Sequence, residues 1–557
     1  MAEFFGQFAR KSNDYLKKTD EDIIRYINEY RDGDYGKVLQ EDDRWEVFYH
    51  LNPMRTALLG WYDFQKDSTL LEIGGGFGAL TGLFCDKCKQ VVSIEKSTKR
   101  AEAIYTRHRN RKNLKVYAAD IQNIQEIIFQ QQFDYIILTG VLEKICQGAE
   151  ELKGYVNILR SCRLLLKHDG KIIIAVNNKC GIRNFCGVLD EYSGLPFGSI
   201  NNFPRNCEGR MFSKSELNLI IKEAGFVYSR YYYPLPDYKL PQVICGEGCK
   251  AGNSIKERII PYYVADDPLI ASENDFYADI INEGALGFLS NSYLVEISNS
   301  ELQTGIVCAT LTMDRGEENG FATIIKENGI VEKRALFPEG KRHLVKCYQN
   351  IMDIERHGIS IVEHKLVDEH IIMPYINAVP LSDELKRIVC NREKFIDIFD
   401  LLFDNIIRSS KHVSSEQNSF LTEENKNLDW GIILKRAYID MVPFNCFLVD
   451  GKLLYFDQEF VRENYPARYV IFRALLYTYY FIPEAERAVP LVEMKRRYTL
   501  EKVWDIFVEE ENRFTAENRN KELYKNFYKW AEIDRSKFRL RANSLKKSDG
   551  KSTRSKR

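Results

Sequence analysis

One short segment, residues 70–81, constrains the fold of this chain more than any other. It reads Leu-Leu-Glu-Ile-Gly-Gly-Gly-Phe-Gly-Ala-Leu-Thr, so an apolar run leads into closely spaced glycines and then into an apolar helical segment. Glycine lets the backbone turn sharply between strand and helix and approach a ligand that a side chain would keep away. The segment therefore predicts a strand, a turn and a helix that together bind a nucleotide-type cofactor.

Two more predicted strands end in acidic residues. The run 90–95 ends in Glu95, about twenty residues beyond the glycines, where a carboxylate can accept hydrogen bonds from both ribose hydroxyls. The run 114–120 ends in Asp120. Strands separated by helices predict a parallel sheet, and ligands of such sheets bind at the carboxyl ends of the strands. We therefore expect Glu95 to bind the ribose of the cofactor.

The glycine spacing fits two cofactors. Gly74, Gly76 and Ala79 satisfy the G-x-G-x-x-A form of the dinucleotide fingerprint, so a nicotinamide-dependent oxidoreductase is one interpretation. Glu72 and Gly78 extend the pattern to E-x-G-x-G-x-G, which resembles motif I of the class I methyltransferases that depend on S-adenosyl-L-methionine (SAM). A dehydrogenase does not predict a third acid at the end of a third strand, so the sequence favours SAM.

This resemblance implies SAM as the cofactor and an α/β fold, a Rossmann-like sheet with helices on both faces. It also implies that Glu72 helps to anchor the amino-acid end of SAM and that Asp120 receives the adenine amino group. Together with the expected ribose ligand, the cofactor-binding residues are Glu72, Gly74, Gly76, Gly78, Glu95 and Asp120.

The next segments continue the alternation of strands and helices. Residues 133–143 read as a fourth strand with its cofactor-side loop, and residues 164–176 read as a helix end, a turn and a fifth strand. The long loop 177–194 comes next, and loops of that length in a compact domain are usually functional. We expect this loop to contribute to the site.

A capping box, Ser213-Lys214-Ser215-Glu216, opens a predicted helix that Gly225 ends, and a predicted strand over 226–233 follows. This order of elements resembles bacterial methyltransferases encoded with genes for surface-polysaccharide and O-antigen synthesis. The resemblance covers roughly residues 45–245 and implies a sugar or lipid-linked glycan as the methyl acceptor. The matching segments are Tyr49-His50-Leu51, the glycine turn, Gly140-Val141-Leu142-Glu143, the loop around Asn178, Phe212-Ser213-Lys214 and Tyr233-Pro234-Leu235-Pro236-Asp237-Tyr238-Lys239.

Methyl transfer places few chemical demands on the protein. It is an in-line displacement, so the protein mainly aligns the acceptor with the sulfonium and excludes water. A base is needed only if the nucleophile still holds its proton, as a sugar hydroxyl does. Glu143, Asp190, Glu191 and Tyr192 are candidates on the acceptor side, and Glu143 and Glu191 are our candidate catalytic residues.

Chain length, net charge and cysteine content limit the functions and partners that we expect. The chain has 557 residues, too many for one hydrophobic core, and its 79 basic and 80 acidic residues give a net charge of −1. Nucleic acid is therefore not an expected partner, because it requires a basic surface. The absence of a long uncharged apolar run and of a leader pattern predicts a soluble, cytoplasmic protein. The 13 cysteines predict reduced thiols, and we expect Cys85 and Cys88 to pack against the sheet rather than to bind zinc.

The second half of the chain carries a different pattern. Asp440, Asn445 and Asp457 follow one another in an order that resembles the catalytic centre of protein-kinase-like and aminoglycoside-type phosphotransferases. Phosphoryl transfer needs an acid that takes the hydroxyl proton, an amide on one magnesium ion and a second acid that bridges the metals. The resemblance implies an α+β kinase-like domain that uses ATP and Mg²⁺. In it Asp440 is the catalytic acid, Asn445 and Asp457 are metal ligands, and Lys333 pairs with the phosphates.

Departures from that pattern leave a second interpretation open. Tyr438-Ile439 stands where His-Arg normally precedes the catalytic Asp, Gln458-Glu459 replaces Phe-Gly, and residues 315–320 make a poor phosphate-covering loop. Glu339 lies at the very start of the predicted helix that would supply the carboxylate partner of the lysine. The alternative is a scaffold protein with a SAM-binding domain and a pseudokinase that positions glycosyltransferases.

We expect four parts in the chain: a helical lid over 1–66, a methyltransferase domain over 67–300, a kinase-like domain over 301–540 and a disordered basic tail over 541–557. Joined methyltransferase and kinase-like domains resemble bacterial chain-terminating enzymes of O-antigen synthesis, which cap the growing glycan by phosphorylation and methylation. By this analogy the second domain phosphorylates or binds the same intermediate. The tail is the part expected to make weak contact with acidic lipid or a partner.

Overall fold

The computed structural model describes residues 1–6, 8, 16–31, 33–128, 131–145, 152–201, 209–250, 258–264 and 268–531. The chain divides into two compact units: unit 1 comprises residues 1–314 and 521–557, and unit 2 comprises residues 315–520. Unit 1 therefore extends past the boundary predicted at residue 300, and it takes in a C-terminal segment expected in the kinase-like domain. The predicted basic tail, 541–557, lies outside the described residues.

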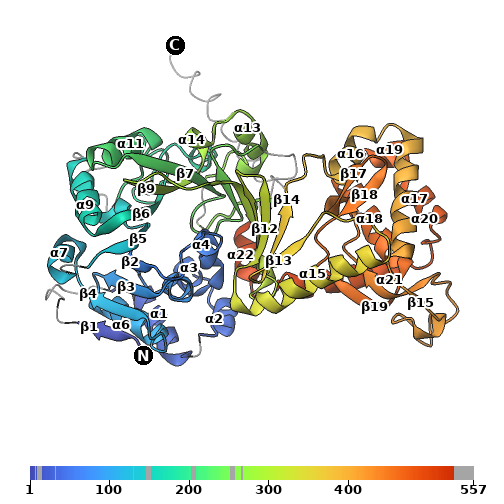
Figure 1. Ribbon diagram of the computed structural model, residues 1–557, viewed down its shortest axis with the longest axis horizontal. Helices are drawn as coiled ribbons and strands as arrows, with labels where there is room; N and C mark the ends of the chain where they lie inside the picture. Colours follow the sequence, from blue (N-terminus) through green and yellow to red (C-terminus); the bar gives the residue numbers. More distant parts are fainter. Residues whose placement is uncertain are drawn as a thin grey trace, which may run out of the picture. The chain divides into compact units, whose positions relative to one another are not determined.

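Unit 1 is built on one twisted sheet (Figure 1). From β1 to β6 the neighbouring strands run parallel, and from β9 to β10 each strand runs antiparallel to its neighbour. From one edge to the other the strands are β1 (Glu3–Phe5), β4 (Leu114–Ala118), β3 (Gln90–Glu95), β2 (Thr69–Ile73), β5 (Phe133–Thr139), β6 (Leu166–Asn177), β9 (Ser292–Ser298), β7 (Tyr228–Leu235), β8 (Val243–Gly246) and β10 (Ile306–Leu311).

The sequence explains why the parallel strands lie at the centre. Val91, Val92 and Ile94 of β3 are at most 1% exposed, and a strand covered on both faces needs apolar residues at successive positions. β2 pairs with β3 on one side and with β5 on the other, so the strand order reverses there. Open α/β sheets bind ligands at such a reversal. The predicted parallel sheet is confirmed, and the glycine turn lies at its switch point.

Two strands, β1 and β10, correct the prediction, and a third, β9, was not predicted. β1 pairs with β4 at the edge of the sheet, although the N-terminal residues were expected to be helical throughout. β9 inserts between β6 and β7, so these two strands are not neighbours. β10 pairs with β8 and thereby adds residues 306–311 to unit 1. Each of these pairings joins segments far apart in the sequence, which periodicity within a segment does not reveal.

Helices cover the sheet of unit 1. Helices α1 and α6 pack together beside β4, and α9 and α11 pack together beside β6. The capping box that opens α11 is confirmed: the Ser213 N–H donates to Glu216 Oε2 at 2.8 Å, and the Glu216 N–H donates to Ser213 Oγ at 3.3 Å. The helices are α1 (Lys18–Glu29), α2 (Gly36–Glu41), α3 (Trp45–Leu51), α4 (Ala57–Gly60), α5 (Thr81–Lys87), α6 (Thr98–Arg107), α7 (Ile124–Ile127), α8 (Leu142–Ile145), α9 (Lys153–Leu164), α10 (Ile182–Phe185), α11 (Lys214–Glu223), α13 (Tyr277–Asn282), α14 (Leu286–Leu289) and α22 (Lys525–Ala531).

Helix α22 returns the C-terminal part of the described chain to unit 1. The side chain of Asn526 donates to the carbonyl of Leu39 in α2 at 3.0 Å. The ring of Trp530 lies edge-on to Trp45 and Phe48 of α3, with centroids 5.5 and 5.1 Å away. Aromatic contacts of this kind contribute about 1 kcal/mol each beyond the area that they bury. Helix α22 thus supports the N-terminal helices of unit 1.

Unit 2 begins with a small antiparallel sheet followed by a mainly helical part. Its first sheet has the order β11, β12, β14, β13, with α15 following β12 in the chain. Strands β11 and β12 pair antiparallel, with Phe321 opposite Ala335, and Lys333 lies on β12. The elements are β11 (Phe321–Lys326), β12 (Ile330–Ala335), α15 (Lys341–Arg356), β13 (Lys365–Val367), β14 (His370–Pro374), α16 (Leu381–Ile388), α17 (Arg392–Arg408), β15 (His412–Val413), β16 (Ile433–Tyr438), β17 (Cys446–Val449), β18 (Lys452–Tyr455), β19 (Val461–Pro466), α18 (Ala467–Phe481), α19 (Ala485–Ala488), α20 (Leu491–Arg497) and α21 (Trp504–Asn518).

A tight hairpin, β17 and β18, carries the segment that the sequence analysis singled out. Val449 pairs with Lys452, so the loop between them has two residues, Asp450 and Gly451, with φ of +49° and +74°. Two positive φ angles define the turn that matches the twist of a hairpin, and Asp-Gly is a favoured sequence for it. The hairpin sets Asn445 just before its first strand and Asp457 just after its second.

Candidate active site

The glycine turn after β2 adopts a backbone conformation that favours glycine. Gly74, Gly76 and Gly78 have φ of +71°, +60° and +77°. The Gly74 N–H donates to the carbonyl of Ile94 in β3 at 2.7 Å, and a Cβ on Gly74 would lie 2.4 Å from Cγ2 of Val141, just beyond β5. The turn is therefore fitted between the ends of β3 and β5, where a side chain has no room.

Glu95 lies directly against this turn. Its Oε2 accepts from the Gly76 N–H at 2.9 Å and its Oε1 from the Ser97 N–H at 3.1 Å. Burial raises the pKa of the Glu95 carboxyl, while the two amides oppose that rise. The structure thus brings the predicted ribose ligand to the predicted glycine turn, at the carboxyl end of β3.

Glu72 lies beneath the turn and is 5% exposed. Its Oε2 accepts from the hydroxyl of Thr81 at 2.6 Å and from the hydroxyl of Ser93 at 2.7 Å, which ties β2 to α5 and to β3. Burial raises the pKa of Glu72 to about 7, with a further contribution from the charge of Glu95. Both of these hydrogen bonds serve the framework of the turn, so Glu72 shapes the site as well as adjoining it.

Asp120, the third strand-end acid, follows β4 at the same edge of the sheet. Its Oδ1 accepts from the Gln122 N–H at 3.1 Å, and its Oδ2 lies 3.1 Å from Nζ of Lys96. The neighbouring Ala119 N–H donates to the carbonyl of Glu95 at 2.9 Å, which joins the ends of β3 and β4. The ends of β2, β3 and β4 therefore present three carboxylates around one turn.

Helix α3 adds a residue to which the sequence analysis gave no role, His50. Its ring lies edge-on to Phe77 with centroids 4.8 Å apart, and its Cε1 is 3.6 Å from the position that a Cβ on Gly76 would take. Burial, assisted by nearby arginines, lowers the pKa of His50 well below its ordinary value, so the ring is neutral. Only the segment Tyr49-His50-Leu51 in the family resemblance signalled this position.

The end of α6 fixes the same turn from another direction. Nη1 of Arg107 donates to the carbonyl of His50 at 2.8 Å and to that of Phe77 at 3.1 Å. Nε2 of His108 lies 2.8 Å from the carbonyl of Gly78. These contacts join α3, the glycine turn and α6, and no local pattern in the sequence indicates them.

Glu143 follows the loop after β5 and is fully buried. Its Oε1 accepts from the Asn177 N–H at the end of β6 at 2.7 Å, and its Oε2 has no hydrogen-bond partner among the described residues. Burial, reinforced by the charge of Glu191, raises the pKa of Glu143 to about 7. A carboxyl with this pKa exchanges a proton readily near neutral pH.

Glu191 takes a different role beside it. Its Oε2 accepts from the side-chain amide of Asn177 at 3.0 Å and from Nζ of Lys239 at 2.5 Å. Burial acts to raise the pKa of Glu191, but the ammonium of Lys239 outweighs it and the pKa is lowered. The two candidate carboxylates thus lie on either side of Asn177 and differ in protonation: Glu191 is ionised, and Glu143 titrates near neutrality.

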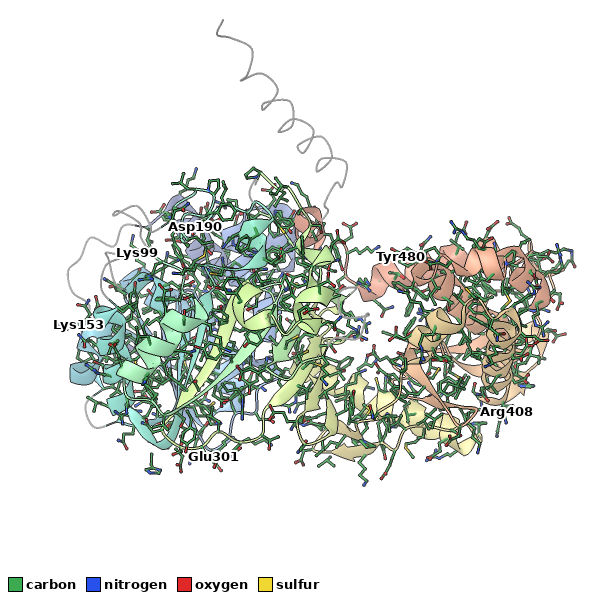
Figure 2. The ribbon with its side chains drawn as sticks, turned by 90° about the horizontal axis from the view of Figure 1, so that it is seen from above. Lys99, Lys153, Asp190, Glu301, Arg408 and Tyr480 are labelled. Carbon is green, nitrogen blue, oxygen red and sulfur yellow. The ribbon has the colours of Figure 1, made fainter. Side chains whose placement is uncertain are left out.

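Asp190, which is labelled in Figure 2, is also a candidate on the acceptor side, but its contacts organise the loop instead. Its Oδ1 accepts from the N–H groups of Tyr192 and Ser193 at 3.0 and 2.9 Å, and its Oδ2 accepts from the Ser199 N–H at 3.0 Å. The Asp190 side chain is thereby occupied in fixing the loop backbone. Tyr192 lies against Glu143, and its hydroxyl has a pKa well above the ordinary value because of burial and the adjacent carboxyls.

The second cluster of predicted residues lies in unit 2. Nζ of Lys333 forms an ion pair with Asp457, and the side-chain amide of Asn445 donates to the carbonyl of Asp440 at 3.1 Å. Asp440 Oδ2 accepts from the Phe460 N–H at 2.8 Å. Burial raises the pKa of Asp440 to about 6. The structure thus brings together Lys333, Asp440, Asn445 and Asp457, although Lys333 precedes the other three by more than a hundred residues.

Carboxylate and amide oxygens at this cluster suit Mg²⁺, which takes one or two protein oxygens and completes its shell with phosphates and water. Asn445 uses its amide nitrogen toward Asp440, which leaves its Oδ1 for a cation, and Asp457 follows the hairpin at φ +55°.

Across the part of the chain that the structure describes, no group of three or more His, Cys, Asp or Glu side chains suits a metal. Cys85 and Cys88 are buried.

Comparison with known proteins identifies the class of unit 1. Residues 71–172 match the family model described as a methyltransferase domain. Comparison with curated proteins gives no match. The matched residues contain the glycine turn, the three strand-end acids and Glu143. Unit 1 therefore contains a methyltransferase domain, and SAM is the cofactor of that domain, which supplies an electrophilic methyl group on a sulfonium when bound. The nicotinamide interpretation receives no support.

Solved structures of methyltransferases are similar to part of the chain. The CcbJ methyltransferase from Streptomyces caelestis is 13% identical over 44% of this chain and 90% of its own, with a TM-score of 0.27. The N-methyltransferase NodS from Bradyrhizobium japonicum WM9, solved with S-adenosyl-L-homocysteine, is 14% identical over 51% and 100%, with a TM-score of 0.28. A SAM-dependent methyltransferase from Archaeoglobus fulgidus is 14% identical over 43% and 91%, with a TM-score of 0.28.

None of the helices in the described part of the chain combines the length and the apolar character needed to cross a membrane.

Proposed function

We propose that unit 1 transfers a methyl group to a hydroxyl oxygen of a sugar or glycan intermediate in surface-polysaccharide synthesis. The observation that supports this acceptor chemistry is Glu143, a buried carboxyl with one oxygen fixed by Asn177 and the other without a partner among the described residues. A hydroxyl must lose its proton as its oxygen forms the new bond to carbon, and Glu143 takes that proton. Glu191 and Lys239 then position Asn177 and, through it, Glu143.

The polar residues around Glu143 favour a polyhydroxylated acceptor. Tyr192 adjoins Glu143, and the hydroxyl of Tyr238 lies 2.6 Å from the position that a Cβ on Gly140 would take, at the end of β5. Phenols and an ion pair provide donors and acceptors for several hydroxyl groups at once. The alignment of one hydroxyl is then set by the contacts of the others.

The acceptor is tested by incubating the protein with labelled SAM and lipid-linked glycan extracts. We expect label in the glycan with wild type and with Glu223→Gln, an exposed control on α11, and at least a hundred-fold lower rate with Glu143→Gln. S-adenosyl-L-homocysteine binding of Glu143→Gln, measured by calorimetry, stays at the wild-type level. Label appearing only in protein or lipid would refute the glycan acceptor, and an unchanged rate in Glu143→Gln would refute the base.

We also propose that unit 2 is a kinase-like domain that binds ATP and Mg²⁺ and phosphorylates or binds the same intermediate. The supporting observation is the meeting of Lys333 on β12 with Asp457 after the hairpin, next to the loop of Asp440 and Asn445. The alternative from another class is a pseudokinase scaffold that positions glycosyltransferases. It is favoured by Tyr438-Ile439, which stands where His-Arg is usual.

Calorimetry separates these interpretations. Wild type is titrated with SAM and with ATP plus Mg²⁺, and the variants Gly76→Asp and Asp457→Ala each serve as the control for the other site. We expect Gly76→Asp to lose SAM alone, because Gly76 has φ +60° and its side chain would lie beside His50 at the turn, and Asp457→Ala to lose ATP alone. If wild type binds SAM but no ATP, phosphotransfer is refuted and methyl transfer stands.

We place the protein in the cytoplasm, with weak membrane contact through the basic tail.

A further inference from the structure

Glu459 lies between two cations in unit 2. Its Oε1 accepts from Nζ of Lys333 at 2.5 Å, and its Oε2 accepts from Nη1 of Arg315 at 2.6 Å. Glu459 and Lys333 are 8% and 3% exposed. Each carboxylate oxygen therefore serves a different cation, and a single side chain sets the separation of the two positive charges.

The contacts of Glu459 keep it ionised. Burial alone would raise the pKa of Glu459. The positive charges of Lys333 and Arg315 outweigh that effect and lower the pKa of Glu459 to about 2. The carbonyl of Glu459 also lies 3.3 Å from Nε2 of His343, near the start of α15. The bridge is thus charged at neutral pH, and Lys333 contacts Asp457 as well as Glu459.

Arg315 belongs to the segment expected to cover the phosphates. That segment, 315–320, has few of the glycines that let backbone amides surround a phosphate. One of them, Gly316, lies close to a neighbouring side chain. A Cβ on Gly316 would lie 2.2 Å from the side-chain amide of Asn520, so this glycine is needed for close packing. A cationic side chain at residue 315 supplies what the backbone of this segment lacks, since a guanidinium pairs with phosphate oxygens through two parallel hydrogen bonds.

Polar side chains of α15 make other contacts within unit 2. Asp353, on α15, accepts from Nη1 of Arg436 at 2.8 Å and from the hydroxyl of Tyr438. Asn350, one turn earlier, donates to the carbonyl of Gln458 at 3.0 Å. These contacts anchor α15 to the strand before Asp440 and to the loop that carries Glu459. Glu339, the acid closest to the start of α15 in the sequence analysis, is exposed.

We propose that Glu459 is a positioning residue that holds Lys333 and Arg315 as a pair of cations for the phosphates of a nucleoside triphosphate. In this arrangement the loop after the hairpin, and not α15, supplies the carboxylate partner of Lys333, and Arg315 is a phosphate-binding residue. The inference rests on the proposed binding of ATP by unit 2. It adds two residues, Arg315 and Glu459, to that site.

The test compares nucleotides that differ in phosphate number. Calorimetry with Mg²⁺ measures the affinities of wild type, Glu459→Gln, Arg315→Gln and the exposed control Glu339→Gln for ATP and for AMP. Arg315→Gln loses a charge-assisted phosphate contact and Glu459→Gln leaves the two cations unpositioned, so each is expected to weaken ATP about ten-fold or more and AMP by less than about three-fold. Glu339→Gln is expected to match wild type. A general structural defect would weaken both nucleotides alike.

The outcomes separate the positioning role of Glu459 from nucleotide binding itself. If wild type binds ATP and both variants retain its affinity within about two-fold, the positioning role is refuted and nucleotide binding stands. If Glu339→Gln is the variant that loses ATP, the partner of Lys333 comes from the start of α15 and the inference is also refuted. If wild type binds no ATP, both proposals fail together. Arg315 is partly exposed, so Arg315→Gln remains informative even if Glu459→Gln does not fold.

Discussion

Glu72 offers a direct test of the electrostatics beneath the glycine turn. In the folded protein its pKa is about 7, against an ordinary value of 4.5, because the carboxyl is buried. Each pKa unit corresponds to about 1.4 kcal/mol, so keeping Glu72 ionised in the folded state costs about 3 kcal/mol. The raised pKa means that the contribution to stability is complete below about pH 4.5 and is lost as the pH rises through about 7.

The substitution Glu72→Gln removes this titration while retaining a side-chain oxygen for Thr81 and Ser93. We expect the variant to gain about 2 to 3 kcal/mol of unfolding free energy relative to wild type between pH 5 and pH 8, because wild type alone must bury a charge at the higher pH. The other buried carboxyls are common to both proteins, so their titration cancels in the difference, apart from that of Glu95, whose charge acts on Glu72. Glu102→Gln, at an exposed position on α6, is the matched control.

Urea unfolding measures this difference. The transition of unit 1 is the one that S-adenosyl-L-homocysteine moves to higher urea, since a ligand stabilises only the unit that binds it. Free energies of that transition are compared at pH 5, 6, 7 and 8 for wild type and both variants. A difference between Glu72→Gln and wild type that stays constant from pH 5 to pH 8 would refute the assignment of a raised pKa to this carboxyl.

Single contacts support three further predictions. Gly74→Ala places a Cβ 2.4 Å from Val141 at φ +71°, so thermal unfolding should show a loss of about 2 kcal/mol or more together with weaker SAM binding. Gly451→Ala has open space but φ +74°, so it should cost only about 1 kcal/mol and leave SAM binding unchanged by calorimetry. The rate of methyl transfer at low SAM should rise with pH through about 7 and level off, since Glu143 acts unprotonated, and this rise should vanish in Glu143→Gln.

The strand ends could be predicted from the sequence because their signals are local. Apolar runs that end in Glu95 or shortly after Glu72 indicate where each strand stops, and the residues at these ends indicate the ligand chemistry. A parallel sheet gathers such ends at one edge. The positions of β1 and β9 could not be predicted in this way. Their pairing depends on which edge of the sheet is open once the other strands are placed, and this is a property of the assembled sheet.

The residues of the candidate site fall into the same two groups: those with a local sequence signal and those placed by packing between distant elements. Acidic residues at strand ends pointed to Glu72, Glu95 and Asp120, and in unit 2 the resemblance to phosphotransferases pointed to Lys333. His50 belongs to no motif that assigns it a role. Its place beside the glycine turn comes from packing between elements distant in the sequence. The protonation states of the two acceptor-side carboxyls likewise depend on burial and on Lys239, which no spacing rule measures.

Unit 1 is formed by two segments that are far apart in the sequence, and this affects how its cofactor turn is supported. His50 reaches the glycine turn because α3 lies over it, and the opposite side of α3 presents Phe48 to Trp530 of α22. A helix from the far end of the described chain therefore holds in place the helix that adjoins the cofactor turn. Sequence proximity assigned residues 521–531 to the kinase-like domain, but their buried aromatic rings pack on unit 1, and burial of apolar surface decides where a helix belongs.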